Sequence, residues 1–329
     1  MNITSEINAM KLTKNSQQML CCPSCKTELK FSEGYLECSS AQCTLCFPIV
    51  RGVPVVIDDS SSVFSVHDFV DQEGSTLKPK SKLERVLVNL VPSIILNLKG
   101  KTNFEKLKTL LLKQNAHPRV LIIGASVLGE GIETLLSEAS IDFVESDVAF
   151  GPRVSIILDA HDIPFQEDSF DAVIIQAVLE HVVDPARCVD EIYRVLKKDG
   201  LVYAETPFMQ QVHLGKYDFT RFTHLGHRRL FRKFEEIDSG AVCGPGMALA
   251  WSYQYFLLSF VKSPKARLFV KFFARVTSFW LTFFDYYLID KAGTFDAASG
   301  YYFMGKKSTY VLSDRALLTL YKGTQMSSF

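Results

Sequence analysis

From Val120 onward, short apolar runs alternate with longer segments whose apolar residues have helical spacing. Five runs occur before residue 207: VLII, IDFVE, VSIIL, DAVIIQA and LVYAET. Between the last two, DPARCVDEIYRVLKKDG has the pattern of a helix, with Asp184 as its N-cap and Gly200 as its C-terminal stop. Strands that are apolar on both faces and alternate with helices are typical of a parallel sheet covered on both sides. The sequence therefore predicts an α/β, doubly wound, mostly parallel sheet.

The first apolar run ends in a turn that contains two glycines. Gly124 follows the run directly, and Gly129 lies near the start of the next helical segment. Glycine lets a ligand approach the backbone closely, and ligands of doubly wound sheets bind beyond the carboxyl ends of the strands. Glu145 and Asp147 stand about 20 residues further on, where an acidic side chain can accept hydrogen bonds from a ribose. The turn is therefore a candidate nucleotide-binding site.

Two familiar phosphate-binding patterns do not fit this turn. The dinucleotide pattern GxGxxG is not matched, because the sequence reads GASVLG from Gly124 to Gly129. No lysine follows the glycines to bind phosphate groups, which excludes a P-loop. A different cofactor is therefore expected.

Residues 158–200, LDAHDIPFQEDSFDAVIIQAVLEHVVDPARCVDEIYRVLKKDG, indicate which cofactor that is. They closely resemble the class I S-adenosylmethionine-dependent methyltransferases of the type 11 kind, and the resemblance covers about residues 120–243. It implies S-adenosylmethionine as the cofactor and a seven-stranded, Rossmann-like sheet, with FEEIDSGAVC and residues 299–307 as the sixth and seventh strands. The chain departs from the family at the turn, where the usual GxGxG is reduced to GASVLG.

The resemblance also implies which residues contact the cofactor. Asp147 would hold both ribose hydroxyl groups, with Glu145 as the alternative, and Asp159 would accept a hydrogen bond from the adenine amino group. The glycine turn would pass beneath the methionine part, and Gln176 would border the sulfonium. The full expected set lies at the carboxyl ends of the predicted strands: Gly124, Ala125, Ser126, Gly129, Glu145, Asp147, Asp159, Ala160, Gln176 and Ala177.

The segment after the fifth strand, TPFMQQVHLGKYDFTRFTHLG, is dense in polar and aromatic residues. It resembles a segment of bacterial methyltransferases that are often associated with surface-glycan or secondary-metabolite pathways. His213, Tyr217, Asp218 and Arg221 are the candidate catalytic residues, since they can supply a proton acceptor, a stacking surface and hydrogen bonds to a hydroxylated substrate. Asp218 and Arg221 can instead form an ion pair that fixes the loop. His181 competes with His213, although a structural role suits its position better.

Six of the eight cysteines lie between residues 21 and 46. Two pairs have the spacing of a tetrahedral zinc site, and four thiolates leave no open position, so the site would be structural. Cys46 is an alternative fourth ligand. The stretch resembles zinc-ribbon segments that precede some bacterial methyltransferases, whose last cysteine lies four residues before an aromatic residue, as Cys43 does before Phe47. A ribbon that has lost its metal is the other interpretation. The expected ligands are Cys22, Cys25, Cys38 and Cys43.

These features predict how the chain is divided. Between the ribbon and the methyltransferase domain, the strongly apolar residues 83–98 are expected to pack on that domain, with membrane contact as the alternative. The expected units are a zinc ribbon at 18–57, a linker with packing helices at 58–115, a methyltransferase domain at 116–310 that includes a hydrophobic helical insertion at 245–298, and a C-terminal tail at 311–329.

The insertion between the sixth and seventh strands is rich in large apolar residues and predicts two helices joined near Ser263–Pro264. A lid, a homo-oligomer interface, peripheral membrane contact and a plain packed cap are the interpretations. The chain begins without the apolar run of a signal peptide, and no stretch reaches about 18 uncharged apolar residues. We expect a cytoplasmic protein, or one held peripherally at the inner face of the membrane.

The leading functional hypothesis is methyl transfer from S-adenosylmethionine to a hydroxyl group of a small molecule or saccharide, such as a surface glycan or a secondary metabolite. Ribosomal-RNA methylation is the alternative, because certain guanine methyltransferases also join a zinc ribbon to this fold. Lys and Arg together number 36, as do Asp and Glu, so a nucleic-acid partner is not expected. A non-catalytic scaffold that has lost the cofactor is the third hypothesis.

Overall fold

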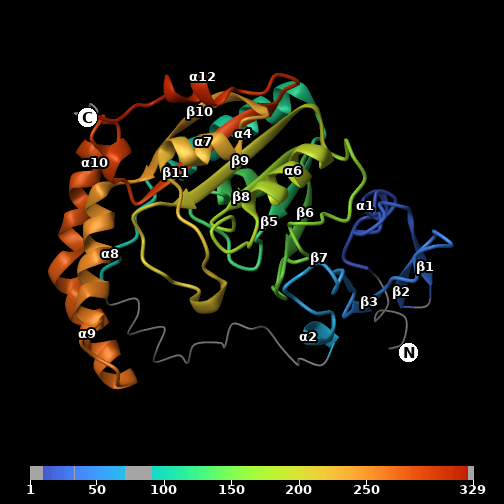
Figure 1. Cartoon of the computed structure of the whole chain (residues 1–329), viewed down its shortest axis with the longest axis horizontal. Helices are drawn as coiled ribbons and strands as arrows, with labels where there is room; N and C mark the ends of the chain where they lie inside the picture. Colours follow the sequence, from blue (N-terminus) through green and yellow to red (C-terminus); the bar gives the residue numbers. More distant parts are fainter. Residues whose placement is uncertain (1–9, 33, 71–90, 325–329) are drawn as a thin grey trace.

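The computed structural model describes residues 10–32, 34–70 and 91–324 (Figure 1). In these residues one eleven-stranded sheet runs through the molecule, in the order β1-β2-β3-β4-β7-β6-β5-β8-β9-β11-β10. The strands are β1 (Leu29–Ser32), β2 (Tyr35–Cys38), β3 (Cys46–Val50), β4 (Val53–Val56), β5 (Arg119–Ile123), β6 (Asp142–Asp147), β7 (Ile156–Leu158), β8 (Phe170–Gln176), β9 (Leu196–Pro207), β10 (Phe234–Cys243) and β11 (Gly300–Lys307).

The apolar runs form the central strands, as the sequence predicts. β7, β6, β5, β8 and β9 are parallel neighbours, and β11 is antiparallel to both β9 and β10. Leu121, Val173 and Val202 are fully buried, one from each of the neighbouring strands β5, β8 and β9. This mixed α/β arrangement fits the predicted Rossmann-like sheet, and it brings the carboxyl ends of β5, β6, β7 and β8 to one edge.

The predicted strand number of seven is wrong for the whole sheet, because four N-terminal strands extend it. β4 lies parallel beside β7, with Val55 opposite Ile157 and Val56 opposite Leu158. β3, β2 and β1 follow as antiparallel neighbours. All four residues of β4 are buried, so both faces of this strand are covered. The N-terminal strands are therefore continuous with the main sheet.

Helices cover the main sheet (Figure 1). α6 starts behind Asp184, whose side chain accepts hydrogen bonds from two backbone N–H groups of the first turn. The predicted stop at Gly200 is wrong: α6 ends at Val195, because Leu196 is extended and pairs with Phe170 as the start of β9. The helices are α1 (Lys14–Gln17), α2 (His67–Val70), α4 (Gly100–Gln114), α5 (Glu133–Leu136), α6 (Pro185–Val195), η1 (Gly215–Tyr217), α7 (His224–Leu230), α8 (Pro245–Leu258), α9 (Pro264–Ser278), η2 (Phe279–Phe284), α10 (Asp285–Leu288), α11 (Thr294–Ala297) and α12 (Asp314–Leu318).

The N-terminal strands share one hydrophobic core with the main sheet. Leu20 and Phe47 are buried in the same cluster as Phe165 and Phe170. Backbone hydrogen bonds also join the two parts, for example from the Cys21 N–H to the Pro164 carbonyl oxygen (3.0 Å). In Figure 1 the strands β1–β3 lie at one end of the molecule, and α8 and α9 lie at the opposite end.

Between β10 and β11 the chain forms the helices α8 to α11, with α8 and α9 side by side (Figure 1). The fully buried Asp285 accepts hydrogen bonds from the N–H groups of Gly246 and Met247, which satisfies the start of α8. No described helix combines the length and apolar character needed to cross a membrane. Large side chains nevertheless face solvent on these helices and on the turn between α8 and α9: Phe256, Phe260, Leu268, Phe269, Phe283 and Tyr287.

Of the apolar stretch 83–98, residues 83–90 lie outside the described residues. Residues 91–98 form neither helix nor strand. Ile94 is buried, and Leu98 packs against the core cluster that contains Ala241 and Ile289. The described part of this stretch therefore packs on the domain that follows it.

Candidate cofactor and acceptor site

The turn after β5 requires glycine at its first position. Gly124 has φ +92°, in the left-handed region, and a Cβ atom there would lie 2.4 Å from Cγ2 of Val178. The N–H groups of Gly124 and Ala125 both donate to the carbonyl oxygen of Ser146 (2.9 Å each). A side chain at Gly124 would therefore clash and strain the backbone, which explains the glycine at the end of this strand.

Of the two candidate ribose ligands, Asp147 faces the turn. Its Oδ2 accepts a hydrogen bond from the N–H of Ser126 (2.8 Å), and its Oδ1 accepts one from the N–H of Ala149 (3.0 Å). Glu145 instead pairs with Arg153, with 2.5 Å between Oε1 and Nε. Each Asp147 oxygen keeps a lone pair, since a carboxylate accepts about four hydrogen bonds. Asp147 can therefore hold the turn and still accept hydrogen bonds from a ribose.

Asp159 and Ala160 follow β7 and are buried. Asp159 Oδ1 contacts His161 through its backbone N–H (2.9 Å) and Nδ1 (2.6 Å), and Oδ2 accepts a hydrogen bond from Ser62 Oγ (2.5 Å). Burial raises the pKa of Asp159, but the hydrogen bonds from His161 and Ser62 outweigh burial, so the pKa is lowered. Oδ2 retains capacity for one further donor, such as an amino group.

Gln176, at the end of β8, presents an unpartnered oxygen to the same region. Its Nε2 donates to Oε2 of Glu205 (2.9 Å), while its Oε1 is buried and accepts no hydrogen bond within the described residues. A Cβ atom at Gly129 would lie 2.2 Å from Cδ of Gln176. Ala177 has φ +53°, so the chain turns sharply here. An orphaned buried oxygen beside a glycine turn fits a ligand that carries a donor group, as the amino group of S-adenosylmethionine does.

Glu205 is a buried carboxylate at the end of β9 with three donors. Tyr203 Oη (2.5 Å) donates to one of its oxygens, and Gln176 Nε2 (2.9 Å) and Asn97 Nδ2 (3.1 Å) donate to the other. Burial raises the pKa of Glu205 to about 7, although these hydrogen bonds oppose the rise. The cluster ties the end of β9 to the segment that leads into α4.

Beyond the carboxyl end of β8, His181 meets His213 from the loop after β9. Their Nε2 atoms are 3.1 Å apart, and the ring planes meet at 84°. Glu180 Oε1 lies 3.6 Å from Nε2 of His181 and 3.9 Å from Nε2 of His213. Glu180 is fully buried, and burial raises its pKa to about 8. Both histidines weighed from the sequence therefore lie in one cluster, together with a carboxylate that sequence reasoning did not single out.

The other candidate catalytic residues support the loop that carries His213. Arg221 pairs with Asp218 through two contacts and donates to the carbonyl oxygens of Gln210 (2.9 Å) and Gln211 (3.1 Å). The N–H of His213 donates to Oδ2 of Asp218 (2.8 Å). Burial raises the pKa of Asp218, but the hydrogen bonds from Arg221 and His213 lower it to about 2. This geometry is that of an ion pair that fixes the loop.

Tyr217 reaches the cluster through its backbone. Its carbonyl oxygen lies 2.7 Å from Nδ1 of His181. Its ring stacks on the ring of Phe64, with 5.5 Å between the centroids, and therefore packs against the segment between β4 and α2. Trp251, from helix α8 of the insertion, contacts the ring of His213, with 6.1 Å between the ring centroids. The insertion therefore borders the candidate acceptor site.

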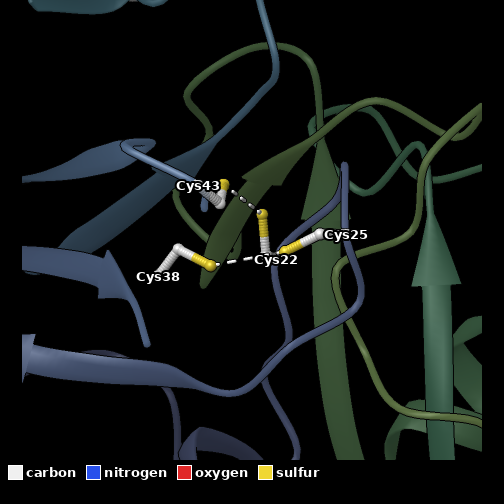
Figure 2. Close-up of side chains that lie close together, drawn as sticks. All are labelled: Cys22, Cys25, Cys38 and Cys43. Carbon is white, nitrogen blue, oxygen red and sulfur yellow. Dashed lines mark hydrogen bonds between the residues drawn. The ribbon is translucent and has the colours of Figure 1, made fainter. Parts of the chain in front are cut away.

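The four predicted zinc ligands come together near β1 and β2 (Figure 2). Their Sγ atoms all lie within 4.8 Å of one another, with 3.8 Å between Cys22 and Cys43 and 3.4 Å between Cys25 and Cys38. Zn–S bonds of 2.3 Å at tetrahedral angles place sulfur atoms about 3.8 Å apart, so the cluster fits one zinc ion. Cys46 lies outside it and is exposed.

Sequence reasoning did not single out Glu180, Glu205 or Asn97. Glu180 lies in the sequence LEH and Glu205 in the sequence AET, and each directly follows an apolar run. A carboxylate that follows a buried strand at the ligand-binding edge is a usable signal. Asn97 carried no such signal, because it precedes α4 in a segment without a motif.

Comparison with known families identifies the part of the chain that carries this site. Residues 124–204 match the family model of the methyltransferase domain. The matched residues begin at the glycine turn and end within β9, so they include the cofactor candidates and the Glu180–His181 pair. The match supports an S-adenosylmethionine-dependent methyltransferase and says nothing of the acceptor.

Three curated relatives are similar to parts of the chain. It is 27% identical over 150 residues to demethylmenaquinone methyltransferase of Clavibacter sepedonicus, covering 46% of this chain and 56% of that protein. It is 35% identical over 75 residues to the mitochondrial arginine-hydroxylase NDUFAF5 of Mus musculus (22% and 21%). It is 33% identical over 87 residues to the ubiquinone/menaquinone biosynthesis C-methyltransferase UbiE of Brucella canis (26% and 29%). The chain thus spans about half or less of the length of each relative.

Among solved structures, phosphoethanolamine N-methyltransferase 2 of Haemonchus contortus in complex with S-adenosyl-L-methionine overlaps with 62% of this chain and 53% of that chain. The sequence identity is 18% and the TM-score is 0.36. A TM-score this low does not establish a shared fold.

Proposed function

We propose that the chain transfers a methyl group from S-adenosylmethionine to a hydroxyl group of a small molecule or saccharide. The observation that carries this proposal is the His181–His213 pair, which follows β8 and β9 at the same sheet edge where the glycine turn follows β5. The side chain of Val178 lies against Gly124, and Val178 precedes Glu180 by two residues in the sequence. A proton-accepting cluster therefore adjoins the candidate cofactor site at one edge of the sheet.

S-adenosylmethionine would supply a methyl group that is activated by the positive charge on sulfur. The chain would hold the ribose with Asp147, the adenine amino group with Asp159 and the amino acid part near Gln176. His213 is the candidate acceptor of the hydroxyl proton, since an imidazole nitrogen can act as a general base. Direct displacement needs the acceptor oxygen in line with the sulfonium, so positioning by the loop and α8 is expected to carry much of the rate.

A membrane-associated acceptor is the second candidate, and the exposed surface of the insertion favours it. Phe260, Leu268 and Phe269 are each at least 67% exposed. Leu268 and Phe269 lie on α9 together with Lys265 and Lys271, which suits an interfacial helix that rests on anionic lipid. Two of the relatives are named as quinone methyltransferases. We propose peripheral membrane contact through α8 and α9, with an acceptor drawn from the lipid phase as the alternative to a soluble one.

The N-terminal thiol cluster is proposed to hold one structural zinc ion. Four thiolates leave no position for water or substrate, so this site would stabilise the turn between Cys22 and Cys25 without taking part in transfer. The continuity of the N-terminal strands with the main sheet supports a structural role, because Cys38 ends β2 and the other three cysteines lie in the segments that lead into β1 and β3.

Titration calorimetry with S-adenosylmethionine tests the cofactor assignment. Asp147→Ala removes the proposed ribose acceptor, and losing a hydrogen bond to a charged group costs roughly 1.5–3 kcal/mol, which is about ten- to a hundredfold in affinity. Glu145→Ala is the matched control and should weaken binding less, because its carboxylate faces Arg153. The opposite ranking would show that Glu145 holds the ribose. No binding by the wild-type chain would favour the non-catalytic scaffold.

The acceptor is sought by following S-adenosylhomocysteine release in the presence of separate cell fractions. A polar metabolite and glycan fraction should stimulate release if the acceptor is soluble, and a lipid extract should do so if it is membrane-associated. Stimulation by ribosomal RNA alone, with salt-sensitive RNA binding, would contradict both and support the nucleic-acid alternative.

A further inference from the structure

The cluster of Glu180, His181 and His213 is assembled from two loops. Glu180 and His181 follow β8, whereas His213 lies beyond β9, the neighbouring parallel strand. One ligand-capable atom from each residue lies within 4.8 Å of the other two. The imidazole of His213 is about one quarter exposed, whereas the Glu180 side chain is fully buried. The cluster therefore has a closed side and a side that a small molecule can approach.

The hydrogen bonds of the two rings determine which nitrogen atoms carry protons. Nδ1 of His181 lies 2.7 Å from the carbonyl oxygen of Tyr217, and Nδ1 of His213 lies 3.2 Å from that of Gln211. A carbonyl oxygen can only accept, so both Nδ1 atoms donate. Nη2 of Arg221 lies 3.5 Å from Nδ1 of His213, but its two hydrogens have nearer acceptors in Asp218 (2.8 Å) and Gln211 (3.1 Å).

In the neutral rings, both Nε2 atoms then carry lone pairs. These lone pairs face each other across 3.1 Å. Two acceptors at hydrogen-bond distance repel each other unless a positive centre stands between or beside them. Either a proton or a metal cation therefore has to occupy the space that the two nitrogens share.

The carboxylate of Glu180 points toward the same space without any hydrogen-bond donor of its own. Both of its oxygens are buried and accept no hydrogen bond from the residues that the structure describes. Buried polar atoms are nearly always partnered, and an unpaired buried carboxylate is costly. The two Nε2 atoms lie 3.6 and 3.9 Å from its Oε1. A cation bound by all three residues would satisfy both Nε2 atoms and Oε1 of Glu180.

We propose that Glu180, His181 and His213 hold one divalent transition-metal ion through Glu180 Oε1 and the two Nε2 atoms. Two imidazoles and one carboxylate suit Zn²⁺, Mn²⁺, Fe²⁺ or Co²⁺ and leave coordination positions open. Metal bonds of about 2.1 Å place neighbouring ligand atoms about 3.0–3.4 Å apart. The two nitrogens already meet this spacing, and the carboxylate needs to approach by a few tenths of an ångström.

The role of this ion rests on the proposed methyl transfer to a hydroxyl group. An acceptor oxygen in an open position would become more acidic, because a bound cation stabilises the alkoxide. The acceptor O–H bond breaks and its proton passes to water. The oxygen then forms a bond to the methyl carbon, and the carbon–sulfur bond breaks with its electron pair left on sulfur, which gives S-adenosylhomocysteine. His213 acts here as a ligand, and in the absence of metal it acts as the proton acceptor.

Cobalt titration of the full-length chain tests the proposal. The protein is prepared with zinc retained on the thiols and is then titrated with Co²⁺ alone, by calorimetry and by visible absorption. We expect one equivalent to bind, without the sulfur-to-cobalt charge-transfer band that displacement at the cysteines would produce. His213→Ala and Glu180→Gln should each weaken Co²⁺ binding at least tenfold. His117→Ala is the matched control, since it removes an exposed imidazole that precedes β5.

Thermal unfolding of each variant is followed alongside, so that loss of the site is distinguished from loss of the fold. Failure of the folded wild-type chain to bind a Co²⁺ equivalent would overturn the proposal, as would unchanged binding in His213→Ala. In that case the two imidazoles share a proton. S-adenosylmethionine binding without Co²⁺ binding would overturn this inference and leave the proposed function standing. Co²⁺ binding without cofactor binding would support the metal site and contradict the proposed function.

Discussion

The thiol cluster and the Glu180–His181–His213 cluster differ in the number of ligand atoms that they offer and in their exposure to solvent. Four sulfur atoms lie within 4.8 Å of one another, enough to complete a tetrahedral site. The second cluster offers three atoms in a similar space, and one of its rings is partly exposed. A complete ligand set is what a structural ion needs, whereas an incomplete set leaves room for a substrate. The two clusters therefore support different expectations about stability and catalysis.

Their surroundings differ in the same way. Cys22 is buried in the core that contains Leu20 and Phe47, and the strands around it extend the main sheet through β4. His213 instead lies in a loop that Asp218 and Arg221 fix by an ion pair. Loss of the thiol cluster should therefore also destabilise the main sheet, whereas loss of the histidine cluster should affect only the loop that carries His213.

The largest expected effect follows from Cys22→Ser. Structural zinc contributes on the order of 10 kcal/mol of apparent binding energy in isolated zinc-finger peptides, so loss of the ion should lower the unfolding temperature more than any other change considered. Zinc content by elemental analysis should fall by about one ion per chain, and calorimetry should show the lower unfolding temperature. Stoichiometric zinc in this variant would contradict the ligand assignment.

The cofactor is also expected to bind more weakly in Cys22→Ser. β4 pairs with β7, and the segment that follows β4 places the Ser62 hydroxyl on Asp159. Loosening of the ribbon therefore reaches the expected adenine end of the site. Unchanged S-adenosylmethionine affinity in a zinc-free variant would show that the ribbon and the main sheet are energetically separate.

His213→Ala should have the reverse pattern, with slow transfer and little change in stability. Both roles assigned to His213, as metal ligand and as proton acceptor, predict a loss of about 10²–10⁴-fold in the single-turnover rate. Its unfolding temperature and the zinc held by the four thiols should match the wild type, because the side chain is partly exposed on a loop. His181→Ala provides the comparison within the cluster. A near-normal transfer rate in His213→Ala would remove this residue from the mechanism.

The two buried carboxylates at the sheet edge differ in their hydrogen bonds. Glu205 receives hydrogen bonds from Tyr203, Gln176 and Asn97, whereas Glu180 receives none within the described residues. The pKa of Glu205 is raised from 4.5 to about 7 by burial, and the nearby charge of Glu130 adds to the rise. The protonated form is thus favoured in the folded state, despite the donors.

The sign of the pH dependence follows from this shift. The folded state holds the Glu205 proton between about pH 4.5 and 7, where the unfolded state releases it, so the contribution to stability is complete below pH 4.5 and lost as pH rises through 7. The difference is on the order of 3 kcal/mol. Glu205→Gln should flatten the fall in unfolding temperature between pH 5 and 8. An unchanged pH profile would show that Glu205 is ionised in the fold.

The sequence predicts the thiol cluster well because its ligands are local. Two of them are separated by a single tight turn, and their spacing alone indicates the metal. The main strands are equally predictable, since each is a short apolar run. The pairing of β4 with β7 was not predicted, because an apolar strand does not indicate which sheet edge it joins.

The histidine cluster could be predicted only in part. His181 and His213 each follow a parallel strand, and those strands, β8 and β9, are neighbours, so their proximity was accessible from the fold class. The inward direction of the Glu180 side chain could not be predicted from the fold class, because it depends on how the turn after β8 packs against the loop that carries His213. A carboxylate within a motif gives no sign of whether it lacks donors.

The smallest expected effect concerns the choice between Cys43 and Cys46 as the fourth thiolate. Cys46 opens β3 and is exposed, while the next residue, Phe47, is buried, so strand alternation turns the Cys46 side chain away from the core. Cys46→Ser should therefore keep one zinc per chain and change the free energy of unfolding by no more than about 0.5 kcal/mol, as for a typical surface substitution. Cys43→Ser should behave like Cys22→Ser, since its Sγ lies 3.8 Å from that of Cys22. Elemental analysis and calorimetry on this pair separate the two assignments. Zinc loss in Cys46→Ser with zinc retained in Cys43→Ser would mean that the turn from residue 43 to residue 46 rearranges when the metal binds.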